Sequence, residues 1–332
     1  MNTKKKVLLG MSGGVDSSVS ALLLKNAGYD VIGVYMKNWD CAPEDYNDVV
    51  SICEKLDIPY YGLSFKDEYY DKVFKTYLDY LDKGYNINPD VLCNKYIKFD
   101  LLYNTAMKLG CDYFATGHYA KIKDNKLCRP KDSSKDQTYF LYDIDYNILN
   151  KVILPLGDLL KTEVRKIAID NNFINKDKKD STGICFIGNN NFKNFISKYK
   201  EEKIGDIVFN DTVLGKHKGL HFYTIGQRKG LGLSGGPFIV VNKDVSSNTL
   251  IVDKKDSEST KSRIFVIDNK LSDFNGNALF RFSNLGSLHK GVIKDNKITL
   301  DKKIDKVGLG QSIVFYDKDG IVLGGGTLTR FK

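Results

Sequence analysis

The stretch KVLLGMSGGVDSS, residues 6–18, decides how the first part of the chain folds. The apolar run that follows Lys6 predicts a buried strand, and residues 17–27 predict a helix that ends at Gly28. A glycine-rich turn stands between the two. Because the backbone N–H groups of such a turn and of a helix N-terminus bind anions, the stretch predicts a phosphate-binding loop.

Strands and helices alternate after this loop. This order predicts an α/β fold with a doubly wound parallel sheet, in which ligands bind beyond the carboxyl ends of the strands. Strands are expected at 6–10, 31–35, 60–65 and 112–117, and helices at 17–27, 49–56 and 94–109.

Short alternating runs replace this pattern after about residue 190 and predict two small, mainly β domains. A hairpin is expected at Asp317–Gly320, and the polar segment 253–262 is a plausible joint. The expected domains are 1–190, 191–257 and 258–332. The strands expected here are 206–209, 238–241, 249–252, 264–267, 313–316 and 321–323.

The composition is that of an ordinary globular protein, with 42% hydrophobic and 27% charged residues in 332. The sequence contains no run of about 18 apolar residues, so no membrane-spanning helix is predicted. The basic and then apolar start, MNTKKKVLLG, runs into a glycine-rich loop without a cleavage site, so a cytoplasmic protein is expected. A net charge of +9 suits a polyanionic partner, although lysine richness alone does not establish one.

Six cysteines are present, at 41, 53, 93, 111, 128 and 185. None forms a CxxC pair, so no zinc or iron–sulfur site is predicted. Cys53, Cys111 and Cys128 are expected to be small buried residues. Cys93, in NPDVLCNK (88–95), and Cys185, in KKDSTGICFIG (178–188), have more unusual surroundings.

GMSGGVDSS, residues 10–18, lacks the lysine of a Walker P-loop. It resembles the pyrophosphate loop of adenylating enzymes, whose fold is adenine nucleotide alpha hydrolase-like, and this implies ATP as cofactor. Asp16 is expected to help place Mg²⁺, and no metal site of the protein's own is predicted. The alternative is a plain turn with Ser17 as a helix cap. The resemblance assigns ATP to Gly10, Met11, Ser12, Gly13, Gly14, Val15, Asp16 and Ser17, with the adenosine near Met36 and Gly117.

The two cysteine motifs, together with ATGHYA (115–120), KDQTYFLY (135–142), FYTIGQRKGLG (222–232) and GQSIVFY (310–316), resemble the tRNA-specific 2-thiouridylases. The resemblance implies ATP-dependent replacement of the C2 oxygen of the wobble uridine, position 34, by sulfur. A uracil oxygen leaves poorly, so it must first be adenylated, and a persulfide can then supply the sulfur. By position, Cys185 carries the persulfide, Cys93 is the nucleophile, and Asp90 is an acid/base group or a contact to the base.

The chemistry leaves two routes open, because the second thiol either forms a disulfide with the first or attacks directly. Both thiols need lowered pKa values, and a helix that starts at Asn94 would help Cys93. Pro89 stiffens the approach to Asp90 or is simply the first residue of a helix.

The resemblance also implies the partners: the anticodon loops of tRNAs for Lys, Glu and Gln, and a cysteine desulfurase or sulfur-relay protein. Lysine and arginine suit phosphate, and an unstacked base suits glutamine and aromatic side chains. Lys243 is expected on a solvated face. Tyr96 replaces a residue that is usually acidic in the family. The implied RNA contacts are Asn88, Pro89, Asp90, His118, Lys135, Asp136, Gln137, Arg281, Phe282 and Gln311.

Two rival functions remain open. Another adenylating enzyme with the same loop, such as an amidotransferase-type synthetase or a lysidine synthase, would need ATP but neither thiol. A non-catalytic RNA-binding protein would bind RNA without forming AMP.

Overall fold

The computed structural model describes residues 4–39, 43–180, 186, 192–255 and 257–331. They form two compact units, each assembled from separate stretches of the chain. Among the helices described, none has both the length and the apolar character that a membrane crossing requires. Unit 1 comprises Met1–Phe74, Pro89–Gly188 and Asp319–Val322, and unit 2 comprises Lys75–Asn88, Asn189–Lys318 and Leu323–Lys332.

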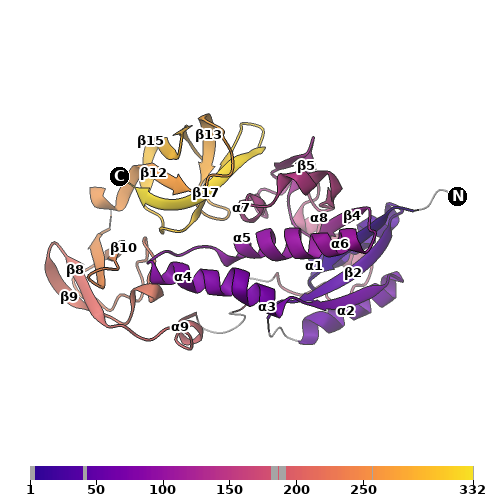
Figure 1. Ribbon diagram of the computed structural model, residues 1–332, viewed down its shortest axis with the longest axis horizontal. Coiled ribbons are helices and arrows are strands. Elements are labelled where there is room, and N and C mark those ends of the chain that lie inside the picture. Colours follow the sequence, from indigo (N-terminus) through magenta and orange to yellow (C-terminus); the bar gives the residue numbers. More distant parts are fainter. Residues whose placement is uncertain (1–3, 40–42, 181–185, 187–191, 256, 332) are drawn as a thin grey trace. The chain divides into compact units, whose positions relative to one another are not determined.

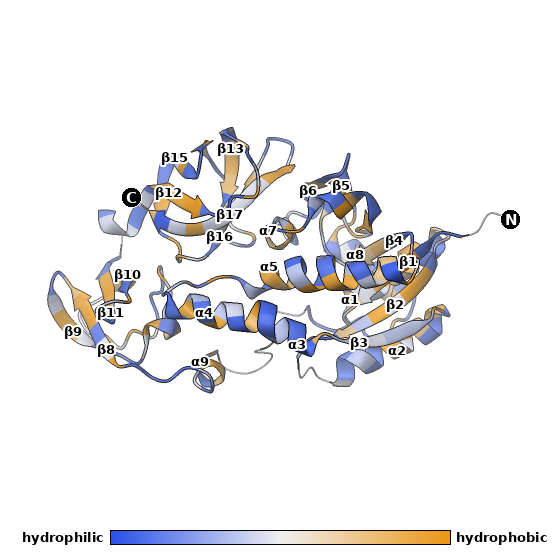
Figure 2. Ribbon diagram, in the orientation of Figure 1, coloured by the Kyte–Doolittle hydropathy of each residue, from blue (hydrophilic) through white to orange (hydrophobic). Residues whose placement is uncertain are grey.

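Unit 1 is built on a five-stranded sheet with the order β3-β2-β1-β4-β7, of which Figure 1 labels β2 and β4. Every neighbouring pair is parallel. Figure 2 shows β1 and β2 as largely hydrophobic, as expected of strands that are buried on both faces. The strands are β1 (Lys6–Met11), β2 (Asp30–Lys37), β3 (Tyr60–Ser64), β4 (Tyr113–Thr116) and β7 (Val152–Ile153).

Helices cover both faces of this sheet, which confirms the doubly wound α/β fold. Val7, Leu9 and Met11 of β1 pack in one core with α1 (Val15–Asn26), α2 (Pro43–Leu56) and α8 (Lys161–Asp170).

A long helix lies on the opposite face. It consists of α5 (Pro89–Cys93), a π-helical stretch η2 (Asn94–Leu102) and α6 (Tyr103–Lys108). The Phe99 ring lies 5.6 Å from that of Phe114 in β4, edge to face. Leu102 packs so closely on Gly10 that a Cβ there would lie 3.3 Å from its Cδ2 atom.

The start of this helix corrects the prediction. A helix was expected from Asn94, but the structure begins it at Pro89, and Cys93 is therefore its fifth residue. Proline is well suited to the first helical position, because its missing N–H would have no partner in the helix there, and Asp90 stands in the first turn, where the dipole favours an acid. The helix at 49–56 likewise starts earlier, at Pro43.

Unit 1 also contains a stretch from near the end of the chain. The N–H of Arg129 donates to the Gly320 carbonyl at 2.9 Å, and Cys128 forms a β-bridge with Ile321. Its remaining elements are α3 (Lys66–Tyr69), β5 (Lys121–Lys123), β6 (Lys126–Cys128), α7 (Thr138–Leu141) and η3 (Tyr146–Lys151), with η1 (Tyr70–Lys75) running on toward α4 (Thr76–Asp82) of unit 2.

Unit 2 contains a four-stranded sheet with the order β10-β11-β8-β9 and a closed barrel with the order β12-β15-β14-β13-β16-β17. These confirm the two small, mainly β domains of the predicted fold class. The sheet strands are β8 (Gly205–Phe209), β9 (Thr212–His217), β10 (Phe238–Asp244) and β11 (Thr249–Lys254). The barrel strands are β12 (Lys261–Asp268), β13 (Gly276–Arg281), β14 (His289–Lys294), β15 (Lys297–Asp305), β16 (Ser312–Tyr316) and β17 (Val322–Phe331).

Aromatic and branched side chains fill the barrel, among them Phe265, Phe280 and Phe315. β16 and β17 are neighbours on either side of the expected hairpin. The prediction missed β9, β13, β14 and β15. β14 and β15 each bury only two alternate residues, and exposed lysines flank these, so the strands lack a continuous apolar run. Short helices complete unit 2: α9 (Phe192–Ile196), η4 (Leu220–Phe222) and η5 (Glu258–Thr260).

Candidate active site

The glycine-rich loop lies where β1 ends and α1 begins, as predicted. Gly14 is the N-cap of α1 and makes no side-chain cap, so the helix N-terminus is not closed by its own cap residue. Gly13 has φ +74°, and a Cβ there would lie 2.3 Å from the carbonyl oxygen of Asp45. Ser17 does not cap the helix but accepts from the Ser12 N–H at 3.2 Å, so it braces the loop from inside.

A lysine from elsewhere in the chain reaches this loop. Nζ of Lys161, the first residue of α8, lies 2.7 and 2.9 Å from the two carboxylate oxygens of Asp16. The same Nζ lies 2.7 Å from Asp180, and the Lys161 side chain is only 12% exposed. The loop thus acquires the cation that a Walker P-loop carries within its own sequence.

A tyrosine also joins this network, and Asp180 is held as a charged group in it. The Tyr119 hydroxyl donates to Asp16 at 2.8 Å, and burial together with that carboxylate raises the pKa of Tyr119, so its proton stays on. Burial raises the pKa of Asp180, but hydrogen bonds with Lys135 and Lys161 outweigh burial and lower it overall.

The segment after α8 holds the back of the loop. The amide of Asn175 donates to the Gly13 carbonyl and to Ser18 Oγ, both at 2.9 Å. Lys178 also reaches the Gly13 carbonyl, at 3.3 Å, and pairs with Asp45 at 2.8 Å. The loop is therefore fixed from behind.

The two residues expected near the adenosine lie at strand ends. Met36 is the penultimate residue of β2. Gly117 follows β4 directly, and a Cβ there would lie 3.0 Å from the Ser17 amide nitrogen, so a larger residue would push into the start of α1. Both stay predictions as ligand contacts.

Cys93 is buried, with 2% of its surface exposed, and Asp90 lies one turn before it in the same helix. The expected help from a helix start does not apply, because the helix begins four residues before Cys93 and the dipole effect fades within the first turn. Cys53, Cys111 and Cys128 are buried too, as predicted. Burial alone therefore does not separate a reactive thiol from a filler.

Lys98 links Asp90 and His118 electrostatically. Burial raises the pKa of Asp90, and Lys98 partly opposes this. Burial, helped by the same lysine, holds the pKa of His118 well below its usual range. Nζ of Lys98 lies 3.5 Å from Nε2 of His118, and Thr116 Oγ1 lies 2.7 Å from Nδ1. Because an ammonium only donates, Nε2 is the acceptor and Nδ1–H donates to Thr116.

The three residues 135–137 differ in their surroundings. Lys135 pairs with Asp180 at 2.7 Å and so belongs to the Lys161 network. Asp136 is fully buried and accepts from Arg129 at 2.6 Å. Gln137 accepts from the Tyr119 N–H at 2.8 Å. Asp136 and Gln137 organise the protein itself here, and their contacts with RNA stay predictions.

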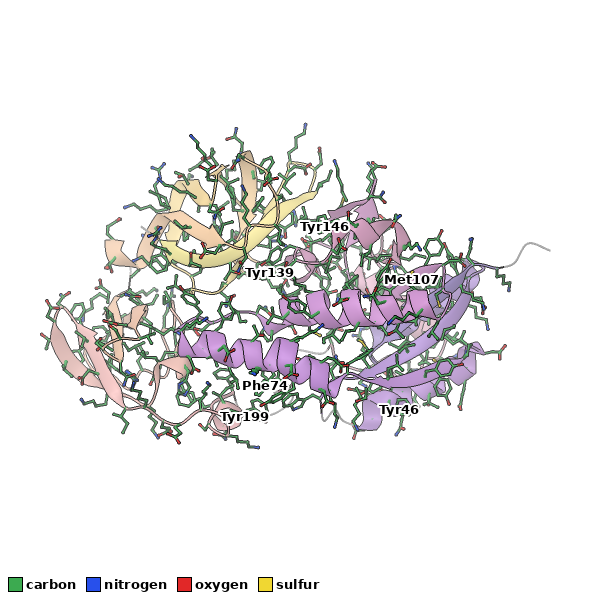
Figure 3. The ribbon with its side chains drawn as sticks, viewed as in Figure 1. Tyr46, Phe74, Met107, Tyr139, Tyr146 and Tyr199 are labelled. Carbon is green, nitrogen blue, oxygen red and sulfur yellow. The ribbon has the colours of Figure 1, made fainter. Side chains whose placement is uncertain are left out.

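Cys185 lies outside the described residues, whereas its neighbour Phe186 is described. Phe186 is buried among aromatic rings, with its centroid 4.9 Å from that of Phe74 and 6.0 Å from that of Trp39. Figure 3 labels Phe74 on its helix. The sulfur-carrying role of Cys185 and its approach to Cys93 stay predictions.

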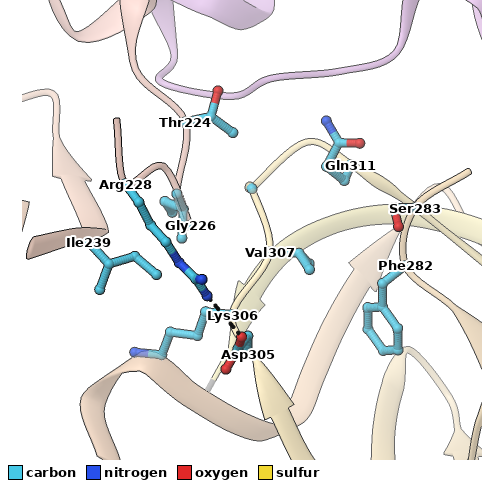
Figure 4. Close-up of a pocket in the computed structure, with 12 residues that line it drawn as sticks. Thr224, Gly226, Arg228, Ile239, Phe282, Ser283, Asp305, Lys306, Val307 and Gln311 are labelled. Carbon is cyan, nitrogen blue, oxygen red and sulfur yellow. Dashed lines mark ion pairs between the residues drawn. The ribbon is translucent and has the colours of Figure 1, made fainter. Parts of the chain in front are cut away.

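Of the RNA contacts predicted in unit 2, two line a pocket of about 430 Å³ (Figure 4). Phe282 and Gln311 line it, and Arg228 lies across from Asp305 at 3.5 Å. Arg281 is 3% exposed and stands over the Tyr316 ring, 5.4 Å from its centroid. Nε2 of Gln311 donates to the Asn86 carbonyl.

Sequence reasoning missed Lys161, Asp180, Lys98 and Asn175 as parts of this site. Asp180 stands inside a quoted motif, and Lys161 opens a predictable helix whose Glu163 side chain accepts from the Leu160 N–H at 2.6 Å. Apart from the motif around Asp180 and the helix start at Lys161, nothing in the local sequence marks these residues. Within the described ranges, no cluster of three or more His, Cys, Asp or Glu side chains could hold a metal ion.

Three family models match the chain: a tRNA methyl transferase HUP domain at residues 5–189, a tRNA methyl transferase PRC-barrel domain at 193–254, and an aminomethyltransferase β-barrel domain at 277–328. A HUP domain is a nucleotide-binding fold, in agreement with ATP at the loop. The NMN synthetase from Francisella tularensis is similar with a TM-score of 0.37 and 18% identity, over 57% of this chain and 72% of that one.

Curated relatives match almost end to end. A tRNA-specific 2-thiouridylase MnmA of Oceanobacillus iheyensis is 45% identical over 98% of this chain and 95% of its own length. One of Geobacillus kaustophilus is 46% identical over 95% of this chain and 93% of its own. The alignment with the first spans 355 residues, more than this chain has, so that relative carries residues without a counterpart here. With nearly half of its aligned residues identical over at least 95% of its length, the chain belongs to the tRNA-specific 2-thiouridylase family.

Proposed function

We propose that this chain uses ATP to adenylate the C2 oxygen of uridine 34 in tRNA and then replaces that oxygen with sulfur, releasing AMP and pyrophosphate. One observation carries this best. The glycine-rich loop and the helix that carries Asp90 and Cys93 are attached to the same parallel sheet. The loop follows β1, and Leu102 of the helix packs on Gly10 near the end of that strand. An activating site and a thiol thus share one scaffold.

The loop suits the β- and γ-phosphates of ATP. Its glycines bring backbone N–H groups and the N-terminus of α1 to the ligand, and Lys161 adds a positive charge. Asp16, whose side chain is 31% exposed, would hold Mg²⁺ with the phosphate oxygens, as Mg²⁺ commonly uses one or two carboxylates in nucleotide sites. When bound, the ion would neutralise charge on the phosphates.

Cys185 and Cys93 would together transfer the sulfur, in one of two ways. The terminal sulfur of the Cys185 persulfide forms a bond to C2, and the C–O bond to AMP breaks. The Cys93 thiolate then attacks Cys185 Sγ, which forms a disulfide and leaves the sulfur on C2. Alternatively, Cys93 attacks first and releases hydrosulfide, which attacks C2 itself. In both routes the two cysteines lose two electrons to the transferred sulfur, so a thiol reductant must restore them.

The burial of Asp90 and His118 is consistent with a site that holds the uracil base away from water. Asp90, with its raised pKa, would supply or accept a proton near C2, or bond to the base. His118 stays neutral and keeps Lys98 in place. Asn88 and Pro89, immediately before Asp90, would border the flipped uridine.

Further RNA contacts would come from Lys135, Arg281 and Gln311, with Phe282 beside the pocket. The family usually has an acidic residue at the position of Tyr96. In this chain, no RNA contact can therefore depend on a carboxylate at that position. We propose tRNAs for Lys, Glu and Gln as the substrates, a cysteine desulfurase or relay protein as sulfur donor, and the cytoplasm as location. The domains would be 1–190, 191–257 and 258–332, with 319–322 returning to the first.

The test is mass analysis of tRNA nucleosides after incubation with ATP, Mg²⁺ and a persulfide source. The expected product is 2-thiouridine, with one AMP per sulfur transferred. Another adenylating enzyme would form AMP, yet would keep its activity when Cys93 or Cys185 is replaced by serine. A non-catalytic RNA-binding protein would bind tRNA and form no AMP. Either result would contradict the proposal.

A further inference from the structure

We propose that Asn86 is a positioning residue for thiolation, through which both β domains of unit 2 hold the segment that leads into the Asp90–Cys93 helix. The inference rests on the proposed function and adds to it a residue that touches neither ATP nor sulfur. The segment, residues 84–88, follows α4 and is called the joint segment below.

The barrel holds the backbone of the joint segment. The Asn86 N–H donates to the Leu309 carbonyl at 2.7 Å, and the Asn86 carbonyl accepts from the side chain of Gln311. Between these two bonds, Gly310 lies directly against the segment. A Cβ at Gly310 would lie 2.9 Å from the Asn86 nitrogen and 2.9 Å from Tyr85 Cβ, and φ is +89° there. Only glycine fits both the conformation and the space.

The small sheet holds the Asn86 side chain. Nζ of Lys243, in β10, donates to Asn86 Oδ1 at 2.7 Å and to the Tyr223 carbonyl at 3.0 Å. Lys243 was expected on a solvated face, which is wrong, because it is half-buried and burial lowers its pKa to about 8. Its two acceptors are neutral oxygens. A buried ammonium is costly without such partners, so these bonds have a strong reason to persist.

Asn86, which both β domains hold, is close in sequence to the helix that carries Asp90 and Cys93. Residues 75–88 belong to unit 2 and unit 1 resumes at Pro89, so only Ile87 and Asn88 separate Asn86 from the helix of Asp90 and Cys93. Three residue steps span at most about 11 Å. The barrel that carries the predicted RNA contact Gln311 is thereby tied to the sulfur-transferring helix by a short connection.

The chemical consequence is orientation. RNA held by unit 2 must present one uridine to Cys93, and a looser joint segment lowers the fraction of complexes in a reactive geometry. Binding of tRNA should depend on that fraction much less than kcat does, because Asn88, Gln311 and the other predicted RNA contacts keep their side chains. Loss of the Asn86 attachment therefore lowers kcat rather than affinity.

The experiment compares four variants of the full chain: Asn86→Ala, Asn86→Asp, Lys243→Met and, as control, Asn277→Ala on the exposed side of β13. We measure kcat for 2-thiouridine, the Kd for tRNA and the melting temperature. Asn86→Ala and Lys243→Met should each lower kcat on the order of tenfold, the scale of a hydrogen bond to a charged group, with the tRNA Kd within about twofold. Asn86→Asp keeps an acceptor for Lys243 and should restore most of kcat.

Several results would overturn the inference: a wild-type kcat in Asn86→Ala, a loss of tRNA affinity in proportion to the loss of kcat, or an Asn86→Asp variant as impaired as alanine. Because Lys243→Met tests the same bond from its other end, the inference remains testable if one variant folds poorly. A wild-type chain that forms no 2-thiouridine contradicts the proposed function itself, and the inference falls with it.

Discussion

Replacing Lys161 by methionine should remove the positive charge that the nucleotide loop borrows from α8. Methionine has a similar length and is apolar, so the side-chain volume stays and the ammonium is lost. We expect a weaker Kd for ATP and an unchanged Kd for AMP, because the lysine faces the part of the loop that suits the β- and γ-phosphates.

The magnitude follows from the contacts of Lys161. At 2.7 Å and an effective dielectric constant of about 20, each of its pairs with Asp16 and Asp180 has a gross attraction of roughly 6 kcal/mol, most of which desolvation cancels. ATP exchanges those carboxylates for phosphate. A charge-assisted hydrogen bond contributes about 1.5–3 kcal/mol net, so the Kd for ATP should rise roughly 10- to 150-fold.

Isothermal titration with ATP and with AMP checks this prediction in the full chain. Lys131→Met is the matched control, because Lys131 pairs with Glu163 of the same helix at 3.1 Å with both side chains more than 40% exposed. That surface pair should matter little. Lys161→Arg keeps the charge and should lie between wild type and methionine. The reasoning fails if Lys161→Met binds ATP as wild type does, or weakens ATP and AMP equally.

Three further outcomes can be measured. Lys98→Met should raise the pKa of both His118 and Asp90, because the lysine lowers both; a carbon-13 titration that leaves either pKa in place contradicts the assignment. The pKa of Asp90 is raised in the folded state, so its contribution to stability is fully present below about pH 3.8 and is lost as the pH rises through the folded pKa. Asp90→Asn should therefore gain stability relative to wild type as the pH rises above 3.8, as denaturant midpoints would reveal. Cys93→Ser should abolish thiolation with the melting temperature unchanged, whereas Cys53→Ser, which alters an equally buried thiol, should keep it; equal activities would remove the nucleophile role.

Local sequence was sufficient for the loop and for four strands of the five-stranded sheet, but it missed the two-residue strand β7. The run from Lys6 to Gly14 carries its own evidence, because apolar continuity marks a buried strand and paired glycines mark a turn with space for a ligand. Apolar periodicity did not locate the start of the helix at Pro89. The prediction followed the apolar periodicity that begins at Ile97 and gave too little weight to a proline in the first helical position.

Residues that act through tertiary contacts could not be found in this way. Lys161 reaches Asp16 across 145 positions of sequence, and Lys243 reaches Asn86 across 157. Each looks locally like one of many lysines in a lysine-rich chain. Only the fold shows that these two are half-buried beside specific acceptors, while others such as Lys302 are exposed.

The return of residues 319–322 to unit 1 has a consequence for how the protein is made. Gly320 and Ile321 bond to the β5–β6 hairpin, so the unit that carries the nucleotide loop stays unfinished until the ribosome has passed both β domains. At an elongation rate of about 5–20 residues per second, that interval is on the order of ten seconds. A nascent or truncated polypeptide that stops before residue 319 therefore lacks part of its first unit, and translation must pass residue 322 before that unit is complete.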